Sequence, residues 1–155
     1  DDGQAISLLA DHLVSLGHRR IGFFGRCGDI AAARNRFAMY VNALCRLGLA
    51  FEPENVCDVS PEVLEDKEFQ INEEINLAVR RMNQGVTAWI CANDWVGYLL
   101  CRGLFNRGLR IPVDVSVTGF DNSLARELSR NTSQQAFYPV CRLCAVYAGR
   151  YFISK

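Results

Sequence analysis

Polar side chains that could bind a small molecule follow three apolar segments of this sequence. Asp121 and Asn122 come directly after "VSVTGF", and Asn93 and Asp94 come directly after "TAWICA". A third group follows "IGFFG" and comprises Arg26, Asp29, Arg34 and Arg36. Carboxylates accept hydrogen bonds, amides both donate and accept, and guanidinium groups donate. Together these groups suit a hydroxyl-rich ligand, because each buried hydroxyl must find a partner.

Each of these positions also has a purely structural interpretation. Asp and Asn side chains commonly cap helix N-termini, which would account for Asp121, Asn122, Asn93 and Asp94 without any ligand. Arg36 falls within an amphipathic segment, where a solvent-exposed arginine is the usual case. The residue types alone leave both interpretations open.

The sequence lacks the common catalytic and metal-binding signatures. It contains no G-x-G-x-x-G, G-x-x-x-x-G-K-[ST], G-x-S-x-G or H-E-x-x-H motif. His12 and His18 do not have a metal-ligand spacing, and "CRLC" at 141–144 has no second cysteine pair nearby and falls in a helical pattern. We therefore predict no catalytic residue, no metal site and no cofactor.

Alternating strands and helices would position the polar groups. The apolar periodicity predicts strands at 21–25, 55–59, 86–92 and 111–120, helices at 4–16, 31–47, 66–84 and 93–107, and a last helix ending near 152. Parallel strands need crossover connections, so the predicted fold class is α/β, an open and mostly parallel sheet with helices on both faces. Ligands of such sheets bind at the carboxyl ends of the strands, where the three polar groups should converge.

Composition argues against direct binding to nucleic acid or membrane. The 155 residues include 17 Lys or Arg and 17 Asp or Glu, and no run of five basic residues occurs. No apolar stretch approaches the roughly 20 residues of a membrane helix, and Asp1 and Asp2 stand where a signal peptide would carry positive charge. Seven cysteines, most of them in apolar segments, favour a reducing cytoplasm.

Four blocks of the sequence resemble the effector-binding domain of LacI/GalR-type bacterial transcription regulators. In order, they are "HLVSLGHRRIGFFG" (12–25), "ARNRFAMYVNALCRLGL" (33–49), "TAWICAND" (87–94) and "RGLRIPVDVSVTGFDN" (107–122). The resemblance implies a periplasmic-binding-protein-like fold of type I, with a ligand held between two lobes. It also implies that residues 1–132 form the C-terminal lobe, that 133–155 cross toward the N-terminal lobe, and that the DNA-binding domain is absent from this chain.

The resemblance assigns roles to three of the polar residues. Arg36 falls on the family's effector-contacting arginine, Asn93 on the asparagine of its Ala-Asn-Asp, and Asp121 on the aspartate of its Gly-Phe-Asp. We therefore predict a cytoplasmic ligand-sensing and dimerisation module whose effector is a sugar or polyol. In the whole regulator, a homodimer would pass the effector signal to operator DNA through a helix-turn-helix domain.

Three residues depart from the family pattern. Met39 and Leu99 each replace a glycine, and Asn131 stands where a leucine commonly precedes Thr-Thr or Thr-Ser. The first two add bulk where helices pack or dimerise, so the pocket size and the dimer geometry stay open.

Two other classes of protein stay open as alternatives. One is a periplasmic sugar-binding transport receptor with the same fold. The other is an α/β enzyme of flavodoxin-like topology, although no phosphate loop or catalytic pair supports it.

The last segment of the chain carries an apolar stripe. Its members are Phe137, Val140, Tyr147, Tyr151 and Phe152. A stripe of this size is rarely left in water, so we expect it to pack against its own lobe or against a neighbouring chain.

Overall fold

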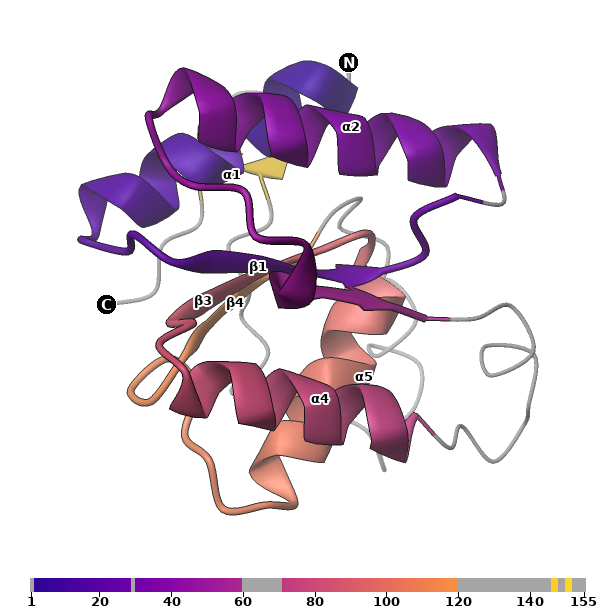
Figure 1. Ribbon diagram of the computed structural model, residues 1–155, viewed down its shortest axis with the longest axis vertical. Coiled ribbons are helices and arrows are strands. Elements are labelled where there is room, and N and C mark those ends of the chain that lie inside the picture. The colour runs from indigo at the N-terminus through magenta and orange to yellow at the C-terminus, as the bar shows by residue number, and fades with distance from the viewer. Residues whose placement is uncertain (1, 29, 60–70, 120–145, 148–149, 152–155) are drawn as a thin grey trace.

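The computed structural model describes residues 2–28, 30–59, 71–119, 146–147 and 150–151. Figure 1 shows a layered lobe in which helices lie on both sides of a central sheet. In chain order the elements are α1 (Asp2–Ser15), β1 (Ile21–Gly25), α2 (Ala31–Arg46), the short 3-10 helix η1 (Pro53–Asn55), β2 (Val56–Asp58), α4 (Asn72–Asn83), β3 (Ala88–Cys91), α5 (Asp94–Phe105) and β4 (Ser116–Thr118).

The central sheet has the strand order β2-β1-β3-β4, and every neighbouring pair is parallel. Helices α1 and α2 cover one face of the sheet, and α4 and α5 cover the other (Figure 1). This arrangement confirms the predicted α/β fold with an open parallel sheet and helices on both faces.

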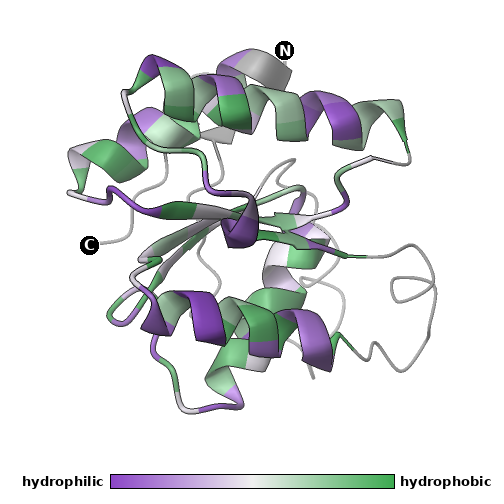
Figure 2. Cartoon of the chain, in the orientation of Figure 1, coloured by the Kyte–Doolittle hydropathy of each residue, from purple (hydrophilic) through white to green (hydrophobic). Residues whose placement is uncertain are grey.

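The two central strands are buried along their whole length because both faces of the sheet are covered. Side chains alternate between the faces: Phe23 and Ile90 pack toward α1 and α2, whereas Phe24 and Trp89 pack toward α4 and α5. Burying one such side chain stabilises the fold by about 1.5–3 kcal/mol. The helices alternate hydrophobic and hydrophilic residues, as Figure 2 shows, so each can pack on the sheet and still face water.

The predicted helix ends are close to the observed ones. Helix α1 is followed by Gly17 at φ 95° and α2 by Gly48 at φ 67°, left-handed conformations that end a helix and favour glycine. Helix α4 begins at Asn72, and residues 66–70, which were also predicted to be helical, lie outside the described residues. Within the described residues, no helix has the length and apolarity of a membrane span.

The last strand of the sheet is shorter than predicted. Instead of 111–120, β4 covers only Ser116–Thr118. A turn precedes it, in which Asp114 N donates to Arg110 O and Arg110 N donates to the Asp114 carboxylate, both at 2.7 Å. Pro112 has no N–H to give to a sheet, and apolar residues in the turn made the strand look longer than it is.

The prediction of a last helix ending near 152 is wrong for the residues that are described there. Val146–Tyr147 (β5) and Arg150–Tyr151 (β6) pair as antiparallel strands. Val and Tyr fit strands better than helices, and this preference outweighed the helical spacing of the apolar residues. Strand β5 lies beside α1 of the same lobe. Residues 137, 140–144 and 152 of this segment lie outside the described residues.

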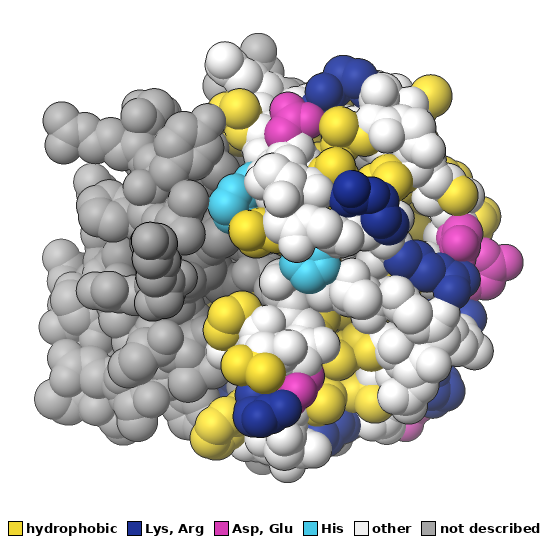
Figure 3. Space-filling view, turned by 90° about the vertical axis from the view of Figure 1, so that its left-hand side faces the viewer, with side chains coloured by type: hydrophobic (Ala, Val, Ile, Leu, Met, Phe, Trp, Pro, Cys, Tyr) yellow, Lys and Arg dark blue, Asp and Glu magenta, His cyan; other side chains and the backbone are white. Residues whose placement is uncertain are grey.

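His18 joins the amino-terminal ends of three strands. Its Nδ1 lies 2.9 Å from Thr87 Oγ1, just before β3, and its Nε2 lies 2.9 Å from Ser116 Oγ, at the start of β4. Figure 3 views this edge of the molecule, where the histidine side chains lie among apolar and neutral groups. Burial lowers the pKa of His18, and neighbouring His12 lowers it further. These contacts give His18 a structural role at this end of the sheet.

The bulky departures from the family pattern lie inside this lobe. Leu99 is 1% exposed and belongs to the core under α4 and α5. Met39 is half-buried and packs on the core under α1 and α2. Asn131 lies outside the described residues.

Candidate ligand-binding site

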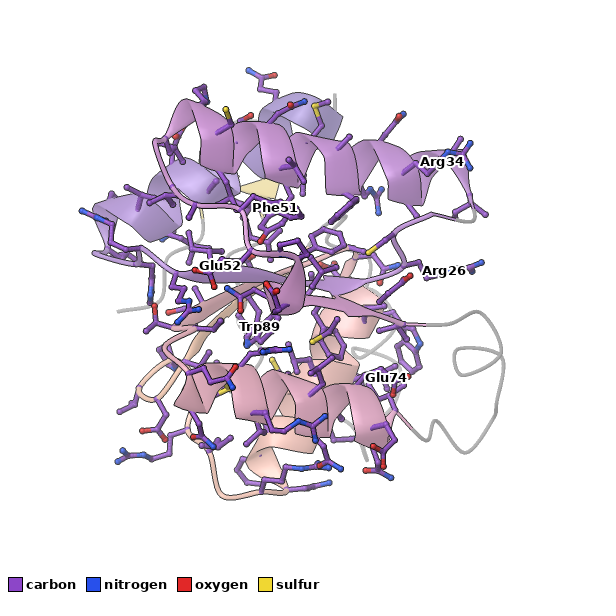
Figure 4. All side chains as sticks on the ribbon, viewed as in Figure 1. Arg26, Arg34, Phe51, Glu52, Glu74 and Trp89 are labelled. Carbon is purple, nitrogen blue, oxygen red and sulfur yellow. The ribbon has the colours of Figure 1, made fainter. Side chains whose placement is uncertain are left out.

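The carboxyl ends of the four parallel strands lie along one edge of the sheet, on the right in Figure 1. The loop after β1 and the start of α2 lie at this edge, and Figure 4 shows Arg26 and Arg34 there. Specific contacts connect each strand end to the next. They bring segments that are far apart in the sequence to one edge of the sheet, which we call the rim.

Asp58, the last residue of β2, holds the loop that follows β1. Its carboxylate accepts a hydrogen bond from Cys27 N at 3.0 Å, and Val59 N donates to Gly25 O at 3.3 Å. Asp58 was not among the predicted ligand-binding residues. The available signal was an acidic residue at the end of the short apolar strand "NVCDV".

Close backbone packing joins the ends of β1 and β3. Ala92 N donates to Phe24 O at 3.0 Å. A Cβ added to Gly25 would overlap the Ala92 side chain and lie 3.2 Å from Ala92 N, and the φ of Gly25 is 144°. Glycine is therefore required on both steric and conformational grounds. This packing brings the loop that carries Arg26 against the loop that carries Asn93.

Arg36 reaches from α2 to the end of β3. Its Nη1 donates to the carbonyl oxygen of Ala92 at 2.8 Å, and the side chain is half-buried. The default interpretation of a solvated arginine on an amphipathic helix therefore does not hold. Since Ala92 directly precedes Asn93, the contact brings two of the three predicted ligand-binding residues next to one another.

Asn93 caps α5, as the structural interpretation proposed. Its Oδ1 accepts from Val96 N at 2.9 Å. Within the described part of the chain, its Nδ2 has no hydrogen-bond partner. The cap therefore fixes the carboxamide in place through its oxygen. Among the described residues nothing uses the amide donor, so capping and ligand binding are compatible roles for this residue.

Asp94 connects α5 to the end of β4. It is 5% exposed, and its carboxylate lies against Gly119, the residue that follows β4. Asp121 and Asn122 follow within three residues but lie outside the described residues. The prediction that Asp121 joins Arg36 and Asn93 therefore stays a prediction.

Cys27, in the loop after β1, is not poised to react as a nucleophile. Burial, with the nearby Asp58 carboxylate, raises the pKa of the Cys27 thiol to about 12. The thiolate is the reactive form, so this cysteine is a poor nucleophile at neutral pH. Among the residues described, no group of three or more His, Cys, Asp or Glu side chains is placed to hold a metal ion.

In this lobe, guanidinium and amide groups lie at the carboxyl ends of parallel strands. This arrangement is typical of the ligand-binding lobes of open-sheet α/β domains. Residues 10–145 match the family described as periplasmic binding protein-like domain. The chain belongs to this family, in the form found in LacI/GalR-type transcription regulators.

Sequence relatives support this assignment. The arabinose metabolism transcriptional repressor of Geobacillus stearothermophilus is 31% identical over 122 residues, which are 79% of this chain and 33% of the repressor. The regulator GalR of Escherichia coli K12 is 26% identical over 140 residues, which are 90% of this chain and 39% of GalR. The chain thus spans about a third of the length of the curated relatives it matches.

Solved structures agree with the sequence relatives. A LacI-family regulator from Mycobacterium smegmatis superposes with a TM-score of 0.71 at 25% identity, over 94% of this chain and 48% of that one. The regulator CelR in complex with cellobiose gives a TM-score of 0.66 at 27% identity, over 82% of this chain and 37% of CelR. The similar proteins named here are regulators and not enzymes.

Proposed function

We propose that this chain is the ligand-sensing and dimerisation lobe of a cytoplasmic LacI-type transcription regulator. Its effector is a sugar or polyol, held at the carboxyl edge of the sheet by Arg36, Asn93 and Asp121. The observation that carries the proposal is the hydrogen bond from Arg36 Nη1 to Ala92 O, because it puts the guanidinium beside Asn93 where the strands end.

The chemistry of the three residues supports a hydroxyl-rich effector. Arg36 donates hydrogen bonds, Asn93 offers an amide donor, and Asp121 would accept from hydroxyl groups. A buried hydroxyl left without a partner costs about 1–3 kcal/mol, so such a set discriminates against apolar ligands. The names of an arabinose repressor and of a cellobiose complex among the similar proteins favour a sugar.

The proposed mechanism is differential binding. In the whole regulator, an effector that bridges this lobe and a second lobe would favour one lobe orientation over the other. A homodimer would pass that change to a helix-turn-helix domain on operator DNA, and effector and operator affinities would then be reciprocally coupled. The proposed regulator contacts neither membrane nor metal.

A thermal-shift screen of the full-length protein tests the effector class. The panel contains arabinose, galactose, cellobiose, sugar phosphates and nucleobases. A ligand present at 100 times its Kd adds about 2.7 kcal/mol of stability, which raises the midpoint by several degrees. We expect a sugar to give the largest shift, and a nucleobase hit without any sugar hit would contradict the proposed class.

Matched arginine variants connect a hit to the proposed site. Arg36→Ala should remove the stabilisation by the sugar. Arg46→Ala is the control, because Arg46 lies at the other end of the same helix, is exposed and pairs with Asp11 at 2.7 Å. An undiminished shift in Arg36→Ala would remove Arg36 from the site.

A further inference from the structure

The Asp58 side chain connects the end of β2 to the loop that follows β1. Asp58 pairs with Gly25 of β1 in the sheet, and its carboxylate accepts a hydrogen bond from Cys27 N at 3.0 Å. The strand ends are also joined by a backbone bond, from Val59 N to Gly25 O at 3.3 Å. The strands therefore stay paired without the Asp58 side chain, and what this side chain holds is the loop.

This loop leads directly into the helix that carries Arg36. Helix α2 begins at Ala31, and Arg34 Nη1 donates back to Gly28 O at 3.0 Å, so the loop and the start of the helix are joined (Figure 4). Further along the same helix, Arg36 Nη1 donates to Ala92 O at 2.8 Å. Hydrogen bonds of this kind span only about 2.7–3.2 Å, so a small shift of α2 would break this one.

We propose that Asp58 is a positioning residue of the effector site, which acts through the loop after β1. This inference rests on the proposed function and adds a residue that does not itself touch the effector. Without the carboxylate, Cys27 N loses its acceptor and the loop is released from the end of β2. Helix α2 would then shift, and the Arg36 guanidinium would leave its place beside Asn93.

The Cys27 thiol reports on the loop without any effector. The residue is half-buried, and its Sγ donates to Gly25 O at 3.5 Å. Burial, with the nearby Asp58 carboxylate, raises the pKa of the thiol to about 12, so little of the reactive thiolate forms at pH 8. Release of the loop would expose the thiol and favour the thiolate. Alkylation of Cys27 should therefore become faster when the loop is released.

The competing explanation is that Asp58 only contributes to the stability of the whole lobe. A less stable lobe would open more often and would expose its buried cysteines as well. Cys101, on α5, is 1% exposed and reports such global opening. Cys45, on α2, is exposed and serves as a reference that reacts in every variant. Faster alkylation of Cys27 without faster alkylation of Cys101 identifies local release of the loop.

The test compares Asp58→Ala with Asp58→Asn in the full-length protein. Iodoacetamide treatment at pH 8 with peptide mass spectrometry gives the alkylation rate of each cysteine. Titration gives the Kd of the panel sugar with the largest thermal shift. Asparagine keeps an oxygen that can accept from Cys27 N, whereas alanine keeps none. Asp11→Ala is the matched control, because it removes a carboxylate that bonds Arg46 at 2.7 Å, at the far end of α2.

We expect D58A to speed alkylation of Cys27 and to weaken sugar binding, each by about tenfold or more, because a hydrogen bond to a charged acceptor is lost. D58N should stay within about threefold of the parent in both measurements, because the bond to Cys27 N is kept in a neutral form. D11A should match the parent in both. Alkylation of Cys101 should not change in any of these variants.

Three alkylation results would overturn the inference. They are a parental rate at Cys27 in D58A, a rate that rises only together with that of Cys101, and a D58N protein as reactive as D58A. If D58A does not fold, Asp58→Glu takes its place, because it moves the carboxylate by one methylene. A parental rate at Cys27 in D58E would then overturn the inference.

The sugar titration separates the positioning role from the proposed function. If a sugar binds the parent and D58A keeps the parental Kd, the positioning role is overturned and the proposed function is not. If no sugar binds the parent protein, the proposed effector class fails. The alkylation rates then decide alone whether Asp58 positions the loop at the rim.

Discussion

At the scale of single residues, Asn93 combines two roles that sequence reasoning treated as alternatives. Its oxygen caps α5 by accepting from Val96 N, and its Nδ2 is a donor without a partner among the described residues. Because the roles use different atoms of one carboxamide, substitutions can separate them.

Asn93→Asp and Asn93→Ala should therefore behave differently. Aspartate keeps an oxygen that caps the helix, so N93D should unfold at close to the parental free energy while losing the amide donor and weakening effector binding. Alanine loses both groups, and N93A should be about 1 kcal/mol less stable as well. Urea unfolding and calorimetric titration measure the two effects. Parental affinity in N93D would show that the amide does not contact the effector.

Arg36 offers a second test at this scale. Lysine keeps the positive charge but lacks the planar guanidinium group, whose several N–H donors could bond Ala92 O and a ligand oxygen at the same time. We expect Arg36→Lys to weaken effector binding nearly as much as Arg36→Ala, with a fall of about tenfold or more, which corresponds to 1.4 kcal/mol. Titration of both variants with the same sugar measures this. Parental effector affinity in R36K would mean that only the positive charge matters at this position.

At the scale of elements, the pattern of the sequence predicted the sheet and the edge at which its polar groups meet. The strand at 21–25 and the helix start at Ala31 were placed correctly, because buried parallel strands and amphipathic helices have distinct periodicities. The short extent of β4 and the pairing of β5 with β6 were missed. The length of β4 depends on a local turn, and the pairing of β5 with β6 depends on strand propensity. The spacing of apolar residues predicts neither feature.

The specific contacts between elements could not be predicted from the sequence either. Asp58 with Cys27, Arg36 with Ala92, and Asp94 with Gly119 each join segments that are distant along the chain. Topology places such residues at the same edge, but the particular partners depend on side-chain packing. Topology placed Arg36 and Asn93 among the polar groups at the strand ends and the family resemblance assigned them roles, whereas only the structure shows what holds them in place.

His18 makes the stability of the sheet sensitive to pH. Burial lowers its pKa in the folded state below the unfolded value of 6.5, so the unfolded chain binds more protons in the window just below 6.5. The stabilising contribution is therefore complete above pH 6.5 and is lost as the pH falls through the folded pKa. Among the described residues, the side chains that contact the ring or shift its pKa are His12, Thr87 and Ser116, and none of these three carries negative charge.

Urea unfolding between pH 7.5 and pH 5 measures this dependence. We expect the free energy of unfolding to fall with acidification, and to fall less steeply in His18→Gln, which can hydrogen bond but does not titrate. Arg19→Gln is a control on the neighbouring exposed residue. An equally steep fall in H18Q would assign the pH dependence to other groups.

At the scale of the whole molecule, this lobe supplies one side of the proposed effector site and one part of a regulator. The chain has equal numbers of acidic and basic residues, so its own field does not favour DNA. The operator binding that we propose for the whole regulator would then depend on residues other than these, and this chain spans about a third of the length of its curated relatives. The proposed effector binding and operator binding should therefore be separable by mutation.

Asp121→Ala in the full-length protein is the test at this scale. The change removes the proposed hydroxyl acceptor and leaves any DNA-binding surface intact, so operator affinity without effector should stay within about twofold of the parent. The shift in operator affinity on adding a saturating sugar, typically 5–150-fold in coupled systems, should disappear. Operator titrations with and without the sugar measure both quantities. A parental shift in D121A would remove Asp121 from the site, and lost operator binding without effector would show that the residue serves the fold instead.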